Sequence, residues 1–360
     1  MRQVTHRWLE SVANTPGGDF AASPAGLWLA LATISVGARG ATAAAFGELL
    51  ETGTEPAAAV AETVRGLEKT DALAMATGVW SRSPLYGEFR AVLPDVGFGE
   101  LDDASPAAID AWVREATGGL IERLPLDLLP STRLLLVNAL ALKARWADPF
   151  DMADTRDRPF TDAAGAVHRV PTMCKTFTSH TAWTVPELSG GLTRVVELRC
   201  ATEGFTPAVV RFVIGSPGRT ATEVLPSAWA PTGMRGRIDA EQVRVLLPRL
   251  TLRTTLEVTE HLPALGLEVA TREYADFSGL SPDRLKIDQV VQEAVVKVAE
   301  EGIEAAAATA VRMRLAAMVT SRPRVEEIAF DRPFGLVVLD STGELPLFTA
   351  WQATAPRFET

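Results

Sequence analysis

The feature that most constrains this chain is a nearly unbroken apolar run near its middle, residues 134–140, which reads LLLVNAL. Consecutive apolar positions without alternation predict a central strand that is covered on both faces, as in the interior of a large sheet. Asn138 interrupts the run, and a buried amide requires hydrogen-bond partners. The fold must therefore contain an internal sheet with a polar group inside it.

Helices are expected before this strand and further strands after it. Apolar spacing predicts two successive helices within residues 25–51 and another over residues 107–124. The later strands are expected at residues 195–198, 209–214, 242–247, 250–255, 292–300, 334–339 and 345–351, the last two forming a hairpin. Helices first and strands later, without βαβ alternation, indicate an α+β fold. We find no internal repeat, linker or clear domain boundary in the 360 residues.

Charge and hydropathy argue against several kinds of partner. The net charge is −10 and the 35 Lys and Arg residues are dispersed, so no nucleic-acid partner is expected. Residues 25–36, the longest apolar stretch, are too few to span a bilayer. Arg65 and Lys69 are nearly alone in their segment, so no glycosaminoglycan site is expected. Residues 1–8 lack the apolar segment of a signal peptide, which leaves a cytoplasmic or, for a processed form, an extracellular location open.

Motifs of ordinary active sites are missing from the sequence. No GxSxG, GxxxxGK[ST] or GxGxxG occurs. The two cysteines, Cys174 and Cys200, are too far apart for a CxxC pair. The four histidines are widely separated and none has a metal-ligand spacing. We therefore expect no enzymatic activity, no metal and no cofactor.

Residues 300–323 form the most informative segment, and two conformations are open to it. Four consecutive alanines, residues 305–308, predict a helix by intrinsic propensity. A period of two predicts a strand instead, since alternate residues from Ile303 onward are small or apolar throughout. Small side chains would let such a strand enter between neighbours without forcing them far apart. This set of alternate residues, the Ile303 set, consists of Ile303, Ala305, Ala307, Thr309, Val311, Met313 and Leu315.

Several motifs, taken in order along the chain, resemble the serpin family. Residues 300–309 are similar to the family's pattern of an acidic pair, a glycine, a small residue, a glutamate and an alanine run. The other motifs lie at residues 20–24, 37–42, 137–139, 143–146, 149–150, 154–155, 247–250, 276–280 and 331–334. Because together they span nearly the whole chain, the sequence is identified as a member of this family.

The resemblance implies a single serpin domain over residues 1–360, with three β-sheets, eight or nine helices and an exposed reactive-centre loop at about residues 300–323. In serpins a target protease attacks the loop and forms an acyl-enzyme, and the loop then inserts into the central sheet. The implied function is that of a monomeric suicide-substrate inhibitor that forms a covalent complex with a serine protease. Before cleavage, we expect the parted strands of the central sheet to leave a gap.

The family's site positions are carried over residue by residue. The breach, at the top of the central sheet, corresponds to Trp146, Thr155 and Arg249, and we expect Arg249 to pair with the hinge residue Glu300. The shutter, beneath the middle of the sheet, corresponds to Ser23, Asn138 and Gln292. The hinge, in which glycine gives the backbone freedom, consists of Glu300, Glu301, Gly302, Ile303, Glu304, Ala305, Ala306, Ala307, Ala308 and Thr309.

Four positions depart from the family pattern. Ile303 stands where inhibitory serpins usually have Thr or Ser, and its bulk is expected to slow entry of the loop. Gly26 replaces a second shutter serine, and Gln292 replaces the usual shutter histidine, so the polar network there must differ. Arg249 stands where serpins usually have lysine.

Two counts place the scissile bond differently. Counting forward from the hinge gives the bond between Ala316 and Ala317, whereas counting back from residues 333–334 gives Met318, Val319, Thr320 or Ser321. The surrounding Ala, Leu, Met and Val residues favour chymotrypsin-, elastase- or subtilisin-like targets, although Arg312 and Arg314 keep trypsin-like targets open. The alternative function is that of a non-inhibitory serpin acting as a carrier or chaperone, to which only Ile303 points.

Overall fold

Three β-sheets, seven α-helices and six 3-10 helices make up the part of the chain that the computed structural model describes. The described residues are 1–13, 18–52, 56–68, 73–142, 144–188, 190–201, 209–303, 323–340 and 342–358. The three sheets agree with the expectation, and the fold is α+β. Eight or nine helices were implied, so the seven α-helices of the described part are slightly fewer.

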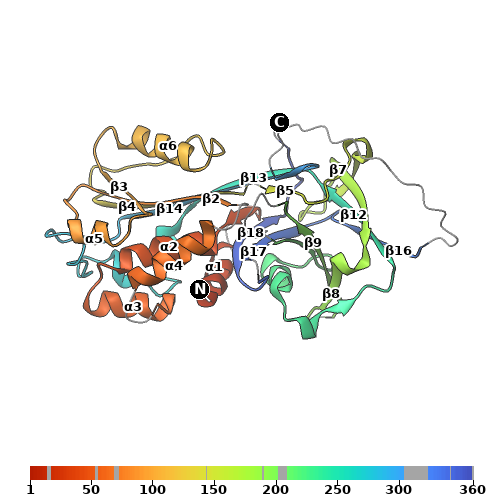
Figure 1. The fold of residues 1–360 in the computed structure, drawn as a ribbon, viewed down its shortest axis with the longest axis horizontal. Coiled ribbons are helices and arrows are strands. Elements are labelled where there is room, and N and C mark those ends of the chain that lie inside the picture. Colours follow the sequence, from red (N-terminus) through yellow and green to blue (C-terminus); the bar gives the residue numbers. More distant parts are fainter. Residues whose placement is uncertain are drawn as a thin grey trace.

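The longer helices lie mainly in the first third of the chain, on both faces of one sheet. Figure 1 shows α6 on one face and α2, α3 and α4 on the other. The α-helices are α1 (Arg2–Val12), α2 (Pro24–Ser35), α3 (Gly40–Leu50), α4 (Pro56–Glu68), α5 (Gly87–Ala91), α6 (Ser105–Ala116) and α7 (Ala221–Val224). The 3-10 helices are η1 (Met152–Asp154), η2 (Ser179–Thr181), η3 (Leu225–Trp229), η4 (Thr232–Met234), η5 (Val258–His261) and η6 (Glu268–Thr271).

One helix is shorter than the sequence predicts. The helix expected to continue to Leu124 ends at Ala116, and the Thr117 hydroxyl donates a hydrogen bond to the Val113 carbonyl just beyond that end. Gly118 and Gly119 follow with φ angles of 62° and 88°, a left-handed conformation that stops a right-handed helix. The apolar residues beyond this point pack against the sheet without being helical.

The main sheet contains the predicted central strand. Its strands are β3 (Gly97–Glu100), β2 (Leu73–Ser81), β4 (Leu134–Leu142), β14 (Gln289–Ala299), β15 (Gly302–Ile303) and β5 (Ala144–Arg145), in that order, with β13 (Leu250–Glu257) also paired to β14. Every residue of β4 is buried, as expected for a strand covered on both faces. β14 is buried at nine of its eleven positions, so both faces of this strand are covered.

Two further sheets complete the molecule. The back sheet runs in the order β1 (Phe20–Ala22), β18 (Pro346–Gln352), β17 (Phe334–Leu339), β10 (Val209–Ile214), β9 (Leu192–Arg199), β8 (Ala182–Pro186) and β11 (Gly236–Arg237). The side sheet runs in the order β16 (Val325–Ala329), β12 (Gln242–Pro248), β7 (Val167–Thr178) and β6 (Arg156–Thr161). β17 and β18 pair antiparallel, which confirms the predicted hairpin.

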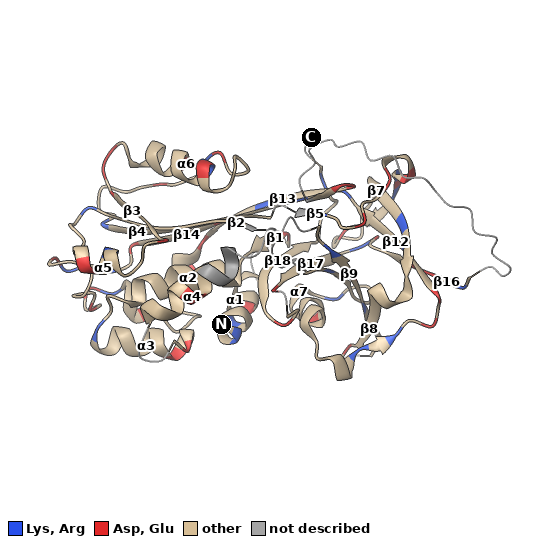
Figure 2. Cartoon of the chain, viewed as in Figure 1, with Lys and Arg blue, Asp and Glu red and all other residues tan. Residues whose placement is uncertain are grey.

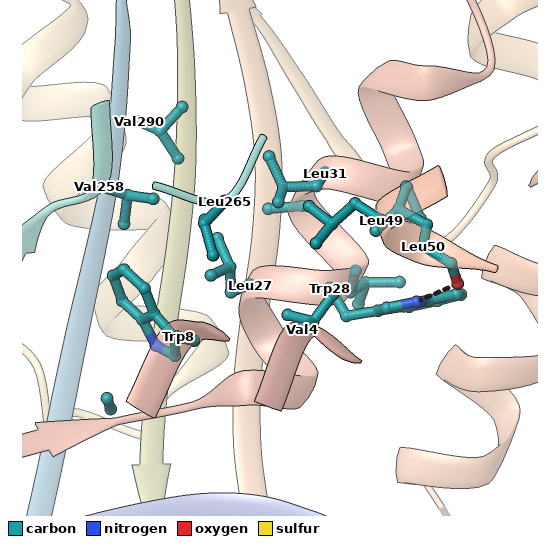
Figure 3. Close-up of a cluster of buried hydrophobic side chains, with 14 of the residues drawn as sticks. Val4, Trp8, Leu27, Trp28, Leu31, Leu49, Leu50, Val258, Leu265 and Val290 are labelled. Carbon is teal, nitrogen blue, oxygen red and sulfur yellow. Dashed lines mark hydrogen bonds between the residues drawn. The ribbon is translucent and has the colours of Figure 1, made fainter. Parts of the chain in front are cut away.

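A large hydrophobic core lies between the main sheet and the helices beneath it. Figure 3 shows Trp8 of α1, Trp28 of α2 and Val290 of β14 in this cluster. The Trp28 indole nitrogen donates to the Leu50 carbonyl over 3.1 Å, so the one polar atom of this ring is satisfied. Burying each large aliphatic side chain stabilises the fold by roughly 1.5–3 kcal/mol. This cluster anchors the helices against the strands that form the site described below.

The surface charges are mixed rather than gathered. Figure 2 shows Lys and Arg residues interspersed with Asp and Glu over the described elements. Among the described helices, none combines the length and apolar character that a membrane crossing requires. Within the same residues, no cluster of three or more potential ligand side chains could hold a metal ion.

Candidate functional site

The candidate site lies at the end of the main sheet where β14 finishes and residues 300–303 begin, called the upper end below. β14 ends at Ala299, and after two turn residues the chain folds back as β15, which pairs with both β14 and β5. Gly302 has a φ of 149°, which L-residues with side chains rarely adopt, so glycine is required at this turn. Gly302 and Ile303 therefore already lie as a short strand between two strands of the main sheet.

Backbone hydrogen bonds secure the turn before β15. The Trp146 amide donates to the Glu301 carbonyl over 2.9 Å, and the Phe150 amide donates to the Glu300 carbonyl over 2.8 Å. The Trp146 indole nitrogen donates to the Ala299 carbonyl over 3.0 Å, and its ring is 3% exposed. The segment after β4 thus holds the end of β14 through both its backbone and its side chain.

A buried ion pair lies at the same end of the sheet. The Glu300 carboxylate accepts from Arg249 Nε over 2.8 and 2.9 Å and from an Arg249 terminal nitrogen over 2.5 Å. The Thr155 hydroxyl donates to the same carboxylate over 2.5 Å. The Glu300 side chain is only 5% exposed, so this is not a surface salt bridge. Removing Arg249 would leave the Glu300 carboxylate buried without compensation, which is strongly destabilising.

A second polar network crosses the middle of the main sheet. The Gln292 carbonyl oxygen accepts from the Ser23 amide over 2.9 Å, while its amide nitrogen donates to the Ser23 carbonyl over 2.9 Å. The same nitrogen donates to the Asn138 side-chain oxygen over 3.0 Å, and the Asn138 amide donates to the Thr77 hydroxyl over 2.9 Å. The hydrogen-bond requirement of Asn138 is therefore met inside the core.

Glutamine suits this position because its side chain both donates and accepts without titrating. A histidine would need one particular tautomer to bond both Ser23 groups, and it would acquire charge in acid. Ser23 also caps α2, since its hydroxyl accepts from the Gly26 amide over 2.9 Å and donates to the Leu347 carbonyl over 2.6 Å. The space that a larger residue at position 26 would need is filled by Asn138 and Leu140.

Below β15 the main sheet is closed, which corrects the expected gap between parted strands. β4 and β14 pair in parallel over eight residue pairs, from Leu135 with Gln289 to Leu142 with Val296. The physical reason is that unpaired backbone groups in a buried sheet are costly, so the strands pair with one another. A strand can enter only by replacing this pairing.

Sequence reasoning did not single out two groups near the site. Glu293 of β14 has a side chain 1% exposed, and burial raises the pKa of its carboxyl despite a hydrogen bond from Thr255 and Arg253 at 3.6 Å. Phe358 lies beneath the cationic groups of Arg249 and Lys297, at 5.4 and 5.1 Å from its ring centre. Glu293 could have been noticed in the sequence, because it is a charged residue within a largely apolar strand. The position of Phe358 could not, because it depends on where the end of the chain folds back.

The remaining predicted positions lie outside the described residues. They are the hinge residues Glu304, Ala305, Ala306, Ala307, Ala308 and Thr309, and the candidate scissile residues Ala316, Ala317, Met318, Val319, Thr320 and Ser321. Both cysteines are free thiols, and burial raises the pKa of Cys200 to about 12. This places no reactive thiolate at Cys200 near neutral pH.

Comparison with known proteins assigns the family. Residues 2–351 match the family model described as Serpin (serine protease inhibitor). Bovine (Bos taurus) serpin B6 is 33% identical over 247 residues, which cover 65% of this chain and 62% of that protein. Bovine leukocyte elastase inhibitor is 30% identical over 357 residues, covering 91% of this chain and 90% of that protein. The chain therefore belongs to the serpin family, whose members include protease inhibitors.

Solved structures support the same fold. The native thermophilic serpin tengpin superimposes with a TM-score of 0.82 at 20% identity, covering 98% of this chain and 93% of that one. Thyroxine-binding globulin in complex with thyroxine has a TM-score of 0.79 at 21% identity and covers 99% of each chain. At these identities the likeness concerns the fold alone.

Proposed function

We propose that this protein is a suicide-substrate inhibitor of a serine protease of the chymotrypsin, elastase or subtilisin type, acting as a monomer. Its reactive-centre loop would be residues 300–323, as the family resemblance implies. The observation that carries the proposal is the position of β15 between β14 and β5, at the head of the ladder that joins β4 and β14. The segment that follows Ile303 thus starts where an inserting strand must start.

The strand register supports insertion residue by residue. Extending the antiparallel pairing of β15 puts Ala305 between Val296 and Leu142, which now pair directly with each other. The same extension puts Arg312 between Gln289 and Leu135, the lowest pair of the ladder. The whole β4–β14 ladder would therefore be replaced without any change of register.

The composition of the loop fits the face that insertion would bury. The Ile303 set would lie beside Val296, Ala294, Gln292 and Val290, whose side chains are all buried. Small apolar residues are needed there, because a charge buried without a partner blocks entry. Thr309 would fall between Gln292 and Asn138, where its hydroxyl can replace part of their direct hydrogen bond.

Incubation with chymotrypsin, elastase, subtilisin and trypsin tests the proposal. Denaturing gels and mass spectrometry should reveal a covalent complex with at least one of the first three enzymes. The released C-terminal peptide should begin at Ala317, or at one of the four positions that follow it. Cleavage of the loop by every protease without any covalent complex would refute inhibition.

The second candidate is a carrier or chaperone serpin. Ile303 is bulkier than the usual hinge residue, and a serpin solved with bound thyroxine shares the fold. Under this alternative the loop is cut as an ordinary substrate, without a complex and without a gain in stability. The same gels, combined with melting of the cleaved product, distinguish the two functions.

A further inference from the structure

The base of the main sheet carries a contact that the proposed function does not use. Asp288, the residue before β14, accepts hydrogen bonds at one carboxylate oxygen from the backbone amides of Arg133 and Leu134, over 2.8 and 3.1 Å. The Asp288 amide donates to the Leu134 carbonyl over 3.3 Å. Three hydrogen bonds thus join Arg133 and Leu134, at the start of β4, to Asp288, which precedes β14.

This contact lies on the path of the inserted strand. Extending the β15 register one residue beyond Arg312 places Met313 between Leu134 and Asp288. Insertion as far as Met313 must therefore separate the carboxylate from both amides. Hydrogen bonds to an ionised carboxylate are about twice as strong as those between neutral groups, so separating Asp288 from these amides opposes the last step of insertion.

A cavity beside the contact leaves room for the residues that follow. It has a volume of about 550 Å³ and is lined from both sides of the strand junction, by Ser131 and Thr132 before β4 and by Leu285 and Lys286 before β14. Arg314, Leu315 and Ala316 come next in the loop. Once Asp288 and Leu134 part, these residues can enter a space that already exists.

We propose that Asp288 is a latch at the base of the main sheet, and that the cavity beside it receives the carboxyl end of the cleaved loop. This inference rests on the proposed function, because it concerns the last step of loop insertion. In the uncleaved protein the latch holds β4 against β14. Its opening sets how fast the loop completes insertion, and hence how often a protease is trapped before it escapes.

A synthetic peptide with the sequence of residues 304–316, which follow the Ile303 already in the sheet, tests the latch without any protease. Annealing of the peptide to the intact protein should be about tenfold faster in Asp288→Ala, equivalent to about 1.4 kcal/mol of activation free energy. Asp288→Asn keeps an acceptor oxygen without the charge and should show an intermediate rate. Asp283→Ala is the matched control, because Asp283 lies 3.4 Å from the Arg133 guanidinium but holds no backbone amide of β4.

Melting of the intact and cleaved forms separates a latch from a general structural role. Asp288→Ala should lower the melting temperature of the intact protein and leave that of the cleaved protein unchanged. Equal losses in both forms, an unchanged annealing rate, or a peptide that anneals to neither variant nor wild type would overturn the inference. Failure to trap any protease would instead refute the proposed function, while the annealing rates would still report on Asp288.

Discussion

Cleavage of the reactive-centre loop should make this protein markedly more stable, and the closed main sheet lets the gain be worked out. Insertion removes one parallel ladder of eight residue pairs between β4 and β14. It creates two antiparallel ladders of similar length, one on each side of the new strand. The net gain is therefore one ladder rather than two, because the strands are already paired before cleavage.

The expected magnitude follows from that difference. With about one hydrogen bond for each residue pair, at roughly 0.5–1.5 kcal/mol net, one additional ladder contributes about 4–12 kcal/mol. Unfolding a chain of 360 residues changes the entropy by about 0.75 kcal/mol per degree. The cleaved form should therefore melt about 5–15 °C above the intact form, with side-chain burial adding to the gain.

Differential scanning calorimetry of the intact and loop-cleaved protein measures this shift. The loop can be cut by limited proteolysis, with mass spectrometry to verify a single cut between residues 304 and 322. If both forms melt at the same temperature, the proposed insertion is wrong. Melting of the cleaved form at a lower temperature would have the same meaning.

Thr309→Arg provides the matched control for the same assay. It would place a guanidinium between Gln292 and Asn138, in the buried network that now joins them. A buried charge without a partner costs several kcal/mol, so the variant should be cleaved without forming a complex and should lose most of the gain. An unchanged yield of covalent complex would show that the Ile303 set does not face the core.

Substitutions at three further positions test the polar groups of the main sheet. Arg249→Ala should lower the free energy of unfolding of the intact protein by about 3–5 kcal/mol, because the Glu300 carboxylate stays buried without its partner. Arg249→Lys should retain most of this stability, and urea denaturation measures both variants. A loss below about 1 kcal/mol for the alanine variant would contradict a buried pair. Gln292→His should make the variant less stable as the pH drops below about 6.5, since a buried imidazole resists protonation. Thermal melts from acid to neutral pH should show this loss in the variant and not in the wild type. Burial raises the pKa of Glu293 above 4.5, so the folded state binds this proton more tightly than the unfolded state, and the carboxylate costs stability as the pH rises. Glu293→Met should therefore raise the melting temperature more at pH 8 than near pH 4.5, and an equal change at both would exclude this cause.

Local sequence patterns were sufficient for the elements whose burial is uniform. The apolar run of β4 identified an internal strand, and the turn between β17 and β18 identified their hairpin. Such patterns depend on neighbours in sequence, so they can be recognised without knowing the fold. The end of α6 was predicted less well, because apolar residues continue past the left-handed glycines that stop the helix.

Positions at the candidate site could be assigned by resemblance, and the expected pairing of Arg249 with Glu300 is confirmed, but the other contacts could not be predicted. Asn138 required partners, yet nothing local indicated that Gln292, 154 residues away, would bond both it and Ser23. The pairing of β4 with β14, which leaves no gap, also depends on segments distant in sequence.

The sequence by itself determined an α+β chain with an internal apolar strand and a segment from Ile303 onward whose alternate residues are small or apolar. Only the tertiary structure decided that the main sheet is closed below Ile303, that the Glu300 carboxylate of the expected pair with Arg249 is buried, and that Asp288 joins the bases of β4 and β14. The reason is physical: periodicity and propensity act within a few residues, whereas each of these contacts arises where distant segments meet and buried polar groups must find partners.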